Sequence, residues 1–282
     1  MMRKLEEAVF RVLMVMATAI IVGSLLLILG TIVIKGIAAL NLDMLTRAPE
    51  GGYYLGGKGG VLNAIIGSLL LATGATTLAV LLGLPVALYL NIYAPAKSRL
   101  AATVRLSLDV LGGVPSIVYG AFGFAIMLVL GLKASLLGGI IAVSLLIMPG
   151  MTRAIDEIIR LVPAELMETS YALGANRLET ALKVVGRQTL PGIISAVLLA
   201  FGRGIGDAAA VLFTTGFTDR ISFSLLEPVA TLPLAIFFQL GTPLPEVQQR
   251  AYASALILTV MILCLSLSAR FLASRYKKYT VK

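Results

Sequence analysis

Six mostly apolar stretches divide this chain, and they constrain its fold more than any other feature. They cover approximately residues 9–34, 61–90, 111–130, 134–148, 192–213 and 252–272. A helix of about 20 apolar residues is long enough to cross the hydrocarbon core of a bilayer. With 59% hydrophobic and 13% charged residues, the chain also lacks the polar surface that a soluble domain needs. The sequence therefore predicts an all-α integral membrane protein with six transmembrane helices.

The positions of the basic residues predict the orientation in the membrane. Most of the 23 Lys and Arg residues flank the apolar stretches on the side that carries both chain ends. Because cytoplasmic segments are enriched in Lys and Arg, both termini are predicted to be cytoplasmic. The net charge of +9 then reflects topology and contact with membrane lipid, and we expect no nucleic-acid partner. The predicted location is the plasma membrane of a bacterium or archaeon, crossed several times.

Three parts follow from this layout. Residues 1–60 comprise the first transmembrane helix and an outer loop, and residues 61–272 form the main transmembrane domain. Residues 273–282 form a basic cytoplasmic tail. In the outer segment 217–249, the apolar run 229–240 is too short to cross the bilayer, so we expect a re-entrant or surface-lying helix there.

The composition excludes several kinds of site. The chain has no histidine, which removes the commonest metal ligand and acid–base group. Residues 52–58, GYYLGGK, have the glycine and lysine spacing of a phosphate-binding loop, but Gly59 follows where Ser or Thr is needed. We therefore expect no metal site, no ATPase activity and no cofactor in this chain.

A charged pair interrupts the fifth apolar stretch, AFGRGIGDAAAVLF at 200–213. Arg203 and Asp207 are four residues apart, so on one helix they share a face. One interpretation is an ion pair that neutralises itself within the bundle. The other is a charged lining of a substrate route, in which Arg203 selects an anion and Asp207 holds and orients Arg203. Gly202 and Gly206 are predicted to form a small-residue packing surface on the same helix.

The third apolar stretch is also irregular. In DVLGGVPSIVYGAFGFAI at 109–126, Pro115 interrupts the helical hydrogen bonds and Ser116 follows it. Kinked helices rich in glycine are common in transport pathways, where they open or close a route, but a merely kinked and packed helix fits equally well.

Most of the inner polar residues lie in one segment, 151–190. Its pattern predicts a helix, a second helix that starts near Pro163, and a glycine-containing bend at LGAN, 173–176. Such a hairpin suits the docking of a soluble partner. An ordinary amphipathic surface hairpin has the same periodicity, so both interpretations stay open.

Residues 167–185, METSYALGANRLETALKVV, resemble the cytoplasmic EAA loop of permease subunits in binding-protein-dependent ABC importers. Glu168 matches the glutamate of that pattern, Thr169 and Ser170 replace its two alanines, and Gly174 lies at the expected spacing. The Leu-Pro pair that ends the pattern comes four residues later, at Leu190 and Pro191. The resemblance implies a coupling loop at about 163–190, with Leu173 also at the contact with an ATPase.

Four blocks in order, GGVPSIVYGAFGFAI, RLVPAELMETSYALGA, GRGIGDAAAVLFT and PVATLPLAIFFQLGTPLPEVQQRAYASALIL, resemble the PstA family of phosphate importer permeases. The resemblance implies a MetI-like bundle and import of inorganic phosphate. It also implies four kinds of partner: a PstC-like second permease, a PstB-like ATPase dimer that binds ATP and Mg²⁺, a PstS-like phosphate-binding protein, and phosphate itself.

The same resemblance assigns Arg203, Asp207 and Arg153 to the substrate pathway, although Arg153 also fits a plain inner-side anchor. A stand-alone secondary anion transporter, or an ABC permease for another oxyanion, is the alternative function. Ion coupling is hard to place for the former, because the predicted spans hold no further buried acid.

Overall fold

The protein folds as a bundle of long helices. The computed structural model describes residues 2–52, 57–95 and 98–276, and every regular element within them is helical. Within these described ranges, five helices are long and apolar enough to cross a membrane, or six if the bent pair α4–α5 is one span. The helices that form the bundle and its bent pair are α3 (Leu62–Ile92), α4 (Arg99–Gly112), α5 (Ser116–Val129), α6 (Leu136–Arg160), α9 (Gly186–Gly206) and α11 (Pro245–Tyr276).

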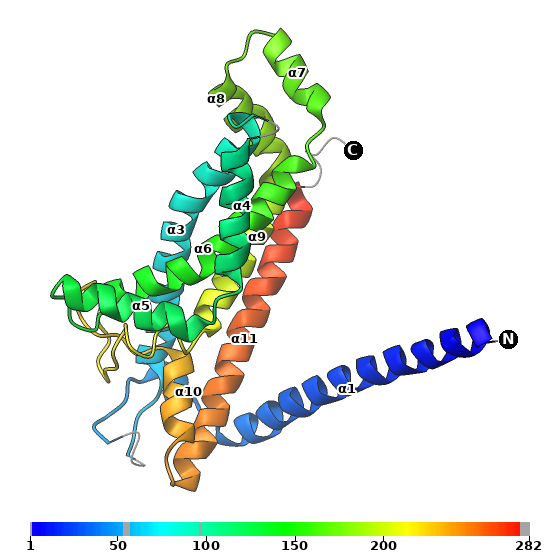
Figure 1. Ribbon diagram of the computed structural model, residues 1–282. Helices are drawn as coiled ribbons and strands as arrows, with labels where there is room; N and C mark the ends of the chain where they lie inside the picture. Colours follow the sequence, from blue (N-terminus) through cyan, green and yellow to red (C-terminus); the bar gives the residue numbers. More distant parts are fainter. Residues whose placement is uncertain (1, 53–56, 96–97, 277–282) are drawn as a thin grey trace.

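Helix α6 lies at the centre of the bundle, packed against α3 along much of its length and also against α4, α5 and α9 (Figure 1). Ser135 begins it, because its hydroxyl accepts a hydrogen bond from the Gly138 N–H. The fourth apolar stretch was predicted to end at 148, but α6 continues through Pro149 to Arg160. The helix continues because its buried face continues, through Ile155 and Ile159.

The third apolar stretch is not one helix. Helix α4 begins at Arg99, earlier than expected, and ends at Gly112, and α5 leaves it at an angle of 102°. Pro115 precedes the first residue of α5, Ser116, so the predicted break at this proline is confirmed. The prediction of one continuous span over 111–130 was wrong, because helices of the bent pair Arg99–Gly112 and Ser116–Val129 divide this stretch at an angle of 102°.

The fifth span was predicted to continue to residue 213, and this was wrong as well. Helix α9 ends at Gly206, and the chain continues as a turn segment through residues 207–216. This segment packs closely on α5, since a Cβ atom at Gly120 would come within 2.9 Å of the carbonyl oxygens of Ala209 and Ala210. The chain therefore leaves helical geometry where protein, not lipid, surrounds its backbone.

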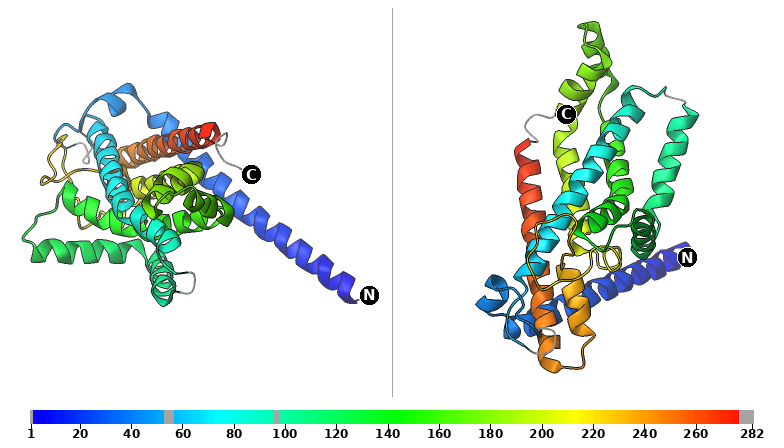
Figure 2. Two further views of the ribbon diagram at one scale, coloured as in Figure 1. Left: turned by 90° about the horizontal axis from the view of Figure 1, so that it is seen from above. Right: turned by 90° about the vertical axis from the view of Figure 1, so that its left-hand side faces the viewer.

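The hairpin predicted for 163–190 is present at one end of the bundle, which we call the inner end (Figures 1 and 2). Pro163 precedes α7 (Ala164–Ala172), and Gly174 turns the chain with a φ of +85°. The chain returns through α8 (Arg177–Glu179) and the π-helix η2 (Thr180–Val185) directly into α9. Asn176 caps this return with a capping box that includes Glu179.

The opposite, outer end carries two short helices, α2 (Leu42–Thr46) and α10 (Leu232–Leu240). The nine-residue α10 confirms the predicted short helix and packs against α11. The loop before it supplies backbone acceptors to the start of α6: Leu136 N–H donates to Glu227 O, and Leu137 N–H to Leu225 O.

Helix α1 (Met2–Ala39) meets the bundle only near its C-terminal end and then runs away from it (Figures 1 and 2). There Gly36 lies against the Tyr252 backbone, and the Lys35 ammonium lies 4.8 Å from the centre of the Tyr252 ring. Part of the outer loop, 53–56, and most of the predicted basic tail, 277–282, lie outside the described residues. The tail's first residues, 273–276, continue α11.

Candidate functional site

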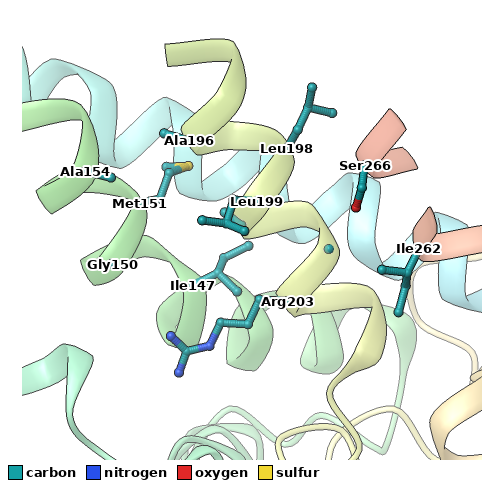
Figure 3. A pocket seen from close by; sticks show the side chains of 12 residues that line it. Ile147, Gly150, Met151, Ala154, Ala196, Leu198, Leu199, Arg203, Ile262 and Ser266 are labelled. Atoms are coloured by element: carbon teal, nitrogen blue, oxygen red, sulfur yellow. The ribbon is translucent and has the colours of Figure 1, made fainter. Parts of the chain in front are cut away.

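Arg203 lies on the exposed face of α9, in a stripe spaced three or four residues apart with Ser195, Leu199 and Gly206. The stripe borders a cavity of about 410 Å³ between α6, α9 and α11. Figure 3 shows the guanidinium extending from α9 on the side of Ile147 and Gly150. A charge on the exposed face of a spanning helix needs water or another protein chain around it, because lipid tails do not solvate it.

The structure does not bring Asp207 to Arg203. Asp207 follows the last turn of α9 with extended backbone angles, and its Oδ2 accepts a hydrogen bond of 2.7 Å from the Ala210 N–H. Among the described residues, no carboxylate lies within 4.0 Å of the Arg203 guanidinium. The mutual ion pair considered from the sequence is therefore absent. Asp207 instead caps the turn segment, as an aspartate caps a helix.

The break between α4 and α5 is bridged by a side chain of α5. Tyr119 of α5 donates a hydrogen bond of 2.8 Å from its hydroxyl to the carbonyl oxygen of Leu111, in the last turn of α4. The same carbonyl oxygen also accepts a hydrogen bond of 3.1 Å from the Val114 N–H, so Tyr119 joins α5 to the turn between the two helices. Pro115 and Ser116 thus lie at the bend itself, as predicted, and Tyr119 connects the two helices across it.

Arg153 lies nearer the inner end, in a cluster of charges that links α3, α4 and α6. Its centre is Asp156, whose side chain is fully buried. Arg105 of α4 binds both oxygens of this carboxylate, at 2.9 and 3.0 Å, and Arg153 binds Oδ2 at 2.9 Å. Asn91 of α3 donates a further hydrogen bond at 2.8 Å, and Arg160 lies 3.7 Å away. Together these contacts pair the buried carboxylate with donors on three helices.

Arg153 itself binds three acids. Its Nε donates to Asp109 of α4 at 2.8 Å, and its Nη atoms pair with Asp156 at 2.9 Å and Glu157 at 3.3 Å. The cluster holds three arginines and three acids, so its formal charge is balanced. In this conformation Arg153 contributes to a structural network, which supports the anchor interpretation more than contact with an anion.

Sequence reasoning missed Asp156 and stated that the spans hold no further buried acid. A signal was available, because Thr152, Ile155, Asp156 and Ile159 recur at the spacing of one helical face. A single acid on an otherwise apolar face indicates a buried charge with a partner. The predicted end of the span at residue 148 had placed Asp156 outside the membrane.

In the inner hairpin, the predicted contact residues separate into two groups. Glu168, Thr169, Leu173 and Gly174 are exposed, and Leu173 is 84% accessible. Ser170 is buried, and its hydroxyl is 2.9 Å from that of Thr180 in η2. Ser170 therefore joins the two arms of the hairpin, while its exposed neighbours form the surface available to a partner.

The small-residue packing surface predicted for α9 differs from the observed one. A Cβ atom at Gly202 would meet nothing within 4 Å, whereas one at Gly204 would lie 3.2 Å from Val143 of α6. Gly206 approaches only Ile262 of α11, at 3.6 Å. Gly204 is the glycine that packs within this chain, and Gly202 lies beside open space in the cavity.

Comparison with known proteins identifies the family. Residues 79–278 match the family described as "Binding-protein-dependent transport system inner membrane component". The chain is 37% identical over 225 residues to the "Phosphate transport system permease protein PstA 1" of Mycobacterium tuberculosis (strain ATCC 25618 / H37Rv), covering 78% of this chain and 72% of the relative. It is 33% identical over 268 residues to PstA of Pasteurella multocida (strain Pm70), covering 95% and 94%. The chain belongs to the PstA family of these permeases.

The fold of this PstA family member is also that of a solved ABC importer permease. It superimposes on a chain of the "MetNI methionine ABC transporter" in inward-facing conformations with TM-scores of 0.63 and 0.64, at 16% and 17% identity. Each superposition covers 77% of this chain and 95% of the other. The predicted MetI-like bundle is confirmed. The chain is a permease subunit of the inner membrane, and a separate subunit supplies the ATPase.

Proposed function

We propose that this chain forms one half of the translocation pathway of an ATP-driven importer of inorganic phosphate. Arg203 is the observation that carries the proposal. It is an exposed guanidinium on a spanning helix, beside a cavity and without an ion-pair partner among the described residues, in a chain similar to phosphate permeases. The planar guanidinium presents donors that match phosphate oxygens.

The exposed stripe of α9 indicates what completes the pathway. Since the Arg203 charge is unsuited to lipid, a second permease subunit facing this stripe would enclose a polar route between the two chains. We propose a PstC-like chain as this second permease.

The remaining partners follow from the two ends of the molecule. The exposed hairpin surface of Glu168, Thr169, Leu173 and Gly174 would fit a groove of a PstB-like ATPase dimer, which binds ATP and Mg²⁺. A PstS-like binding protein would deliver phosphate at the outer end. Closure of the ATPase dimer would then favour one of two arrangements of the permease helices, as a ligand shifts a two-state equilibrium.

A pathway with one arginine suits transport better than a site that surrounds phosphate with hydrogen-bond donors. Phosphate in water keeps its hydration, so a pathway has to compensate part of that hydration without holding the ion too tightly for release. Arg203 supplies one charge-assisted contact. Asp207, which the sequence assigned to the pathway, supports it indirectly by ending α9 just beyond Arg203.

The test is reconstitution of the purified complex in liposomes, with radiolabelled phosphate and the binding protein. We expect uptake that requires this chain, the second permease, the ATPase and ATP. Uptake by this chain alone, driven by an ion gradient, would instead establish a secondary transporter. ATP-driven uptake of sulfate without phosphate would overturn the substrate assignment and leave the ABC permease role intact.

A further inference from the structure

A polar cavity lies at the outer end of the molecule, where α1 and α11 meet (Figure 1). Its volume is about 590 Å³, within the roughly 300–1,000 Å³ of small-molecule sites. Its walls come from the end of α1, from α2, from residues 58–59 and from the first two turns of α11. Seven of its eleven lining residues carry polar or charged side chains, so the cavity suits a charged ligand.

The cavity lies at the level of the membrane surface. One apolar span, Val9–Ala39, ends at its wall, and another, Pro245–Ser268, begins there. Beside it the Lys35 ammonium lies 4.8 Å from the centre of the Tyr252 ring. Tyr and Lys side chains of this kind gather where the hydrocarbon core meets water. The cavity is therefore at the depth of the lipid headgroups.

Apolar side chains continue from the cavity along the outside of the chain. Ile34 and Ile37 of α1 and Leu42 of α2 are all exposed. Acyl chains of a lipid can cover these side chains while its headgroup enters the polar cavity.

Two charged side chains of the cavity lack a partner of opposite charge. Asp43 pairs with Arg47 at 3.1 Å. Among the described residues, by contrast, no acid lies within 4.0 Å of the Lys58 ammonium, and no base within 4.0 Å of the Glu246 carboxylate. Both side chains are exposed. The cavity thus offers an available cation from the loop and an available anion from α11.

The elements that carry these two charges are held by hydrogen bonds. Arg250 Nη1 donates to the Gly57 carbonyl oxygen at 2.7 Å, which joins α11 to the loop. The Val61 N–H donates to the Met44 carbonyl oxygen at 2.9 Å, which joins the loop to α2. A site formed in advance in this way loses less entropy when a ligand binds.

We propose that this cavity binds the headgroup of a zwitterionic phospholipid that carries a primary ammonium, such as phosphatidylethanolamine. Lys58 binds the phosphate group and Glu246 binds the ammonium, each through a charge-assisted hydrogen bond. A bound headgroup joins the loop before α3 to α11, next to the contact of α1 with the bundle. The inference is independent of the proposed function, because neither residue lies on the route assigned to Arg203.

A free phosphate ion shares the phosphate chemistry but not the ammonium. It therefore gives Glu246 nothing to bind, and the carboxylate would repel it. Removing the Glu246 charge should weaken binding of the headgroup but strengthen binding of the free ion. This opposite sign separates the two sources of phosphate.

The test is a titration of the delipidated, purified complex, without its binding protein. Phosphatidylethanolamine and phosphatidylcholine with identical acyl chains are each added, and bound lipid is counted by native mass spectrometry. The ethanolamine lipid should bind about threefold more tightly or better, because a trimethylated ammonium has no N–H to donate. Lys58→Gln and Glu246→Gln should each lower its affinity by about threefold, the effect of one exposed charge pair.

Two further variants serve as controls. Lys133→Gln removes an exposed lysine from the turn between α5 and α6 and should leave lipid affinity unchanged. Lys58→Arg keeps the charge and should retain binding. Thermal unfolding of each variant shows whether a change in affinity reflects the cavity or the fold, and both substituted residues are exposed, so normal folding is expected.

The second arm repeats the titration with inorganic phosphate, followed by calorimetry. Tighter phosphate binding in Glu246→Gln, with unchanged affinity for phosphatidylethanolamine, would assign the cavity to the free ion and overturn the proposal. Equal affinity for the two lipids would overturn it as well, and so would an affinity for phosphatidylethanolamine that neither Lys58→Gln nor Glu246→Gln lowers.

Discussion

Asp207 Oδ2 accepts a hydrogen bond of 2.7 Å from the Ala210 N–H, and this contact ends α9 one turn beyond Arg203. A carboxylate that sequence spacing places opposite an arginine thus acts as a backbone cap. The two charges have separate tasks: Arg203 remains available to the cavity, and Asp207 stabilises the non-helical segment 207–216.

The stability of variants at Asp207 should depend on how well the new side chain caps the turn rather than on its charge. Asn and Ser are good caps, so Asp207→Asn and Asp207→Ser should retain most of the stability, while Asp207→Ala should lose about 0.5–2 kcal/mol. Thermal unfolding in detergent, followed by circular dichroism, measures this difference. Loss of transport in Asp207→Asn equal to that in Asp207→Ala, at unchanged stability, would show that the negative charge is what matters.

Arg203→Gln should abolish phosphate uptake, and Arg203→Lys should retain part of it, because lysine keeps the charge but not the planar donor geometry. Uptake into proteoliposomes measures both variants. Arg220→Gln removes an exposed basic residue from the outer loop and serves as the matched control. Full uptake by Arg203→Gln would reduce Arg203 to an architectural residue.

Asp156→Asn should strongly destabilise the inner end. The substitution removes the charge that pairs with Arg105 and Arg153, and breaking a buried ion pair typically costs about 3–5 kcal/mol. Glu157→Gln, on the same helix but exposed, should cost less than about 1 kcal/mol. Denaturant unfolding of the two purified variants compares them, and equal stability would show that the cluster does not hold the helices together.

Leu173→Asp should leave the chain in the membrane but prevent co-purification of the ATPase. Leu173 is 84% exposed on the hairpin, so a charge there does not disturb this chain's core but would oppose an apolar contact in a partner. Tagged permease is solubilised and the bound ATPase is quantified. Leu226→Asp, at an exposed leucine of the outer loop, is the control, and undiminished ATPase in Leu173→Asp would contradict the docking role of this surface.

Substitutions at Gly174 test whether the backbone conformation of the same hairpin matters for ATPase binding. Its φ of +85° favours glycine, and asparagine tolerates such angles better than branched residues do. Gly174→Val should therefore reduce ATPase co-purification more than Gly174→Asn. Similar losses in the two variants would indicate that side-chain size at the contact matters rather than backbone conformation.

Sequence periodicity predicted the features that depend on local chemistry. Pro115 breaks its helix, Pro163 and Gly174 bound α7, and residues 232–240 form a helix too short to span. In each case proline geometry, glycine freedom or length alone decides the outcome. These are properties of a few adjacent residues, so no distant contact is needed to predict them.

The errors arose where distant segments decide the structure. Helix α9 ends at Gly206 because the backbone of 207–216 finds partners elsewhere: the Thr214 carbonyl accepts from Ser135 N–H, and the Thr215 carbonyl accepts from Val229 N–H. Asp156 is buried because Asn91 and Arg105 come from two other helices to meet it. A hydropathy window covers only neighbouring residues and includes none of these distant contacts. A prediction made from it therefore extends the helix past Gly206 and places Asp156 in solvent.

Because η2 is continuous with α9, a small rotation of the inner hairpin would produce a larger displacement at Arg203. From Thr180, which is tied to Ser170, an almost unbroken helical rod of roughly 34 Å leads to Arg203. A tilt of only about 5° at the hairpin end would move Arg203 by about 3 Å, the length of one hydrogen bond. The ATPase would therefore need only a small rotation of the hairpin to make or break the contact between guanidinium and anion, and the rod itself need not bend.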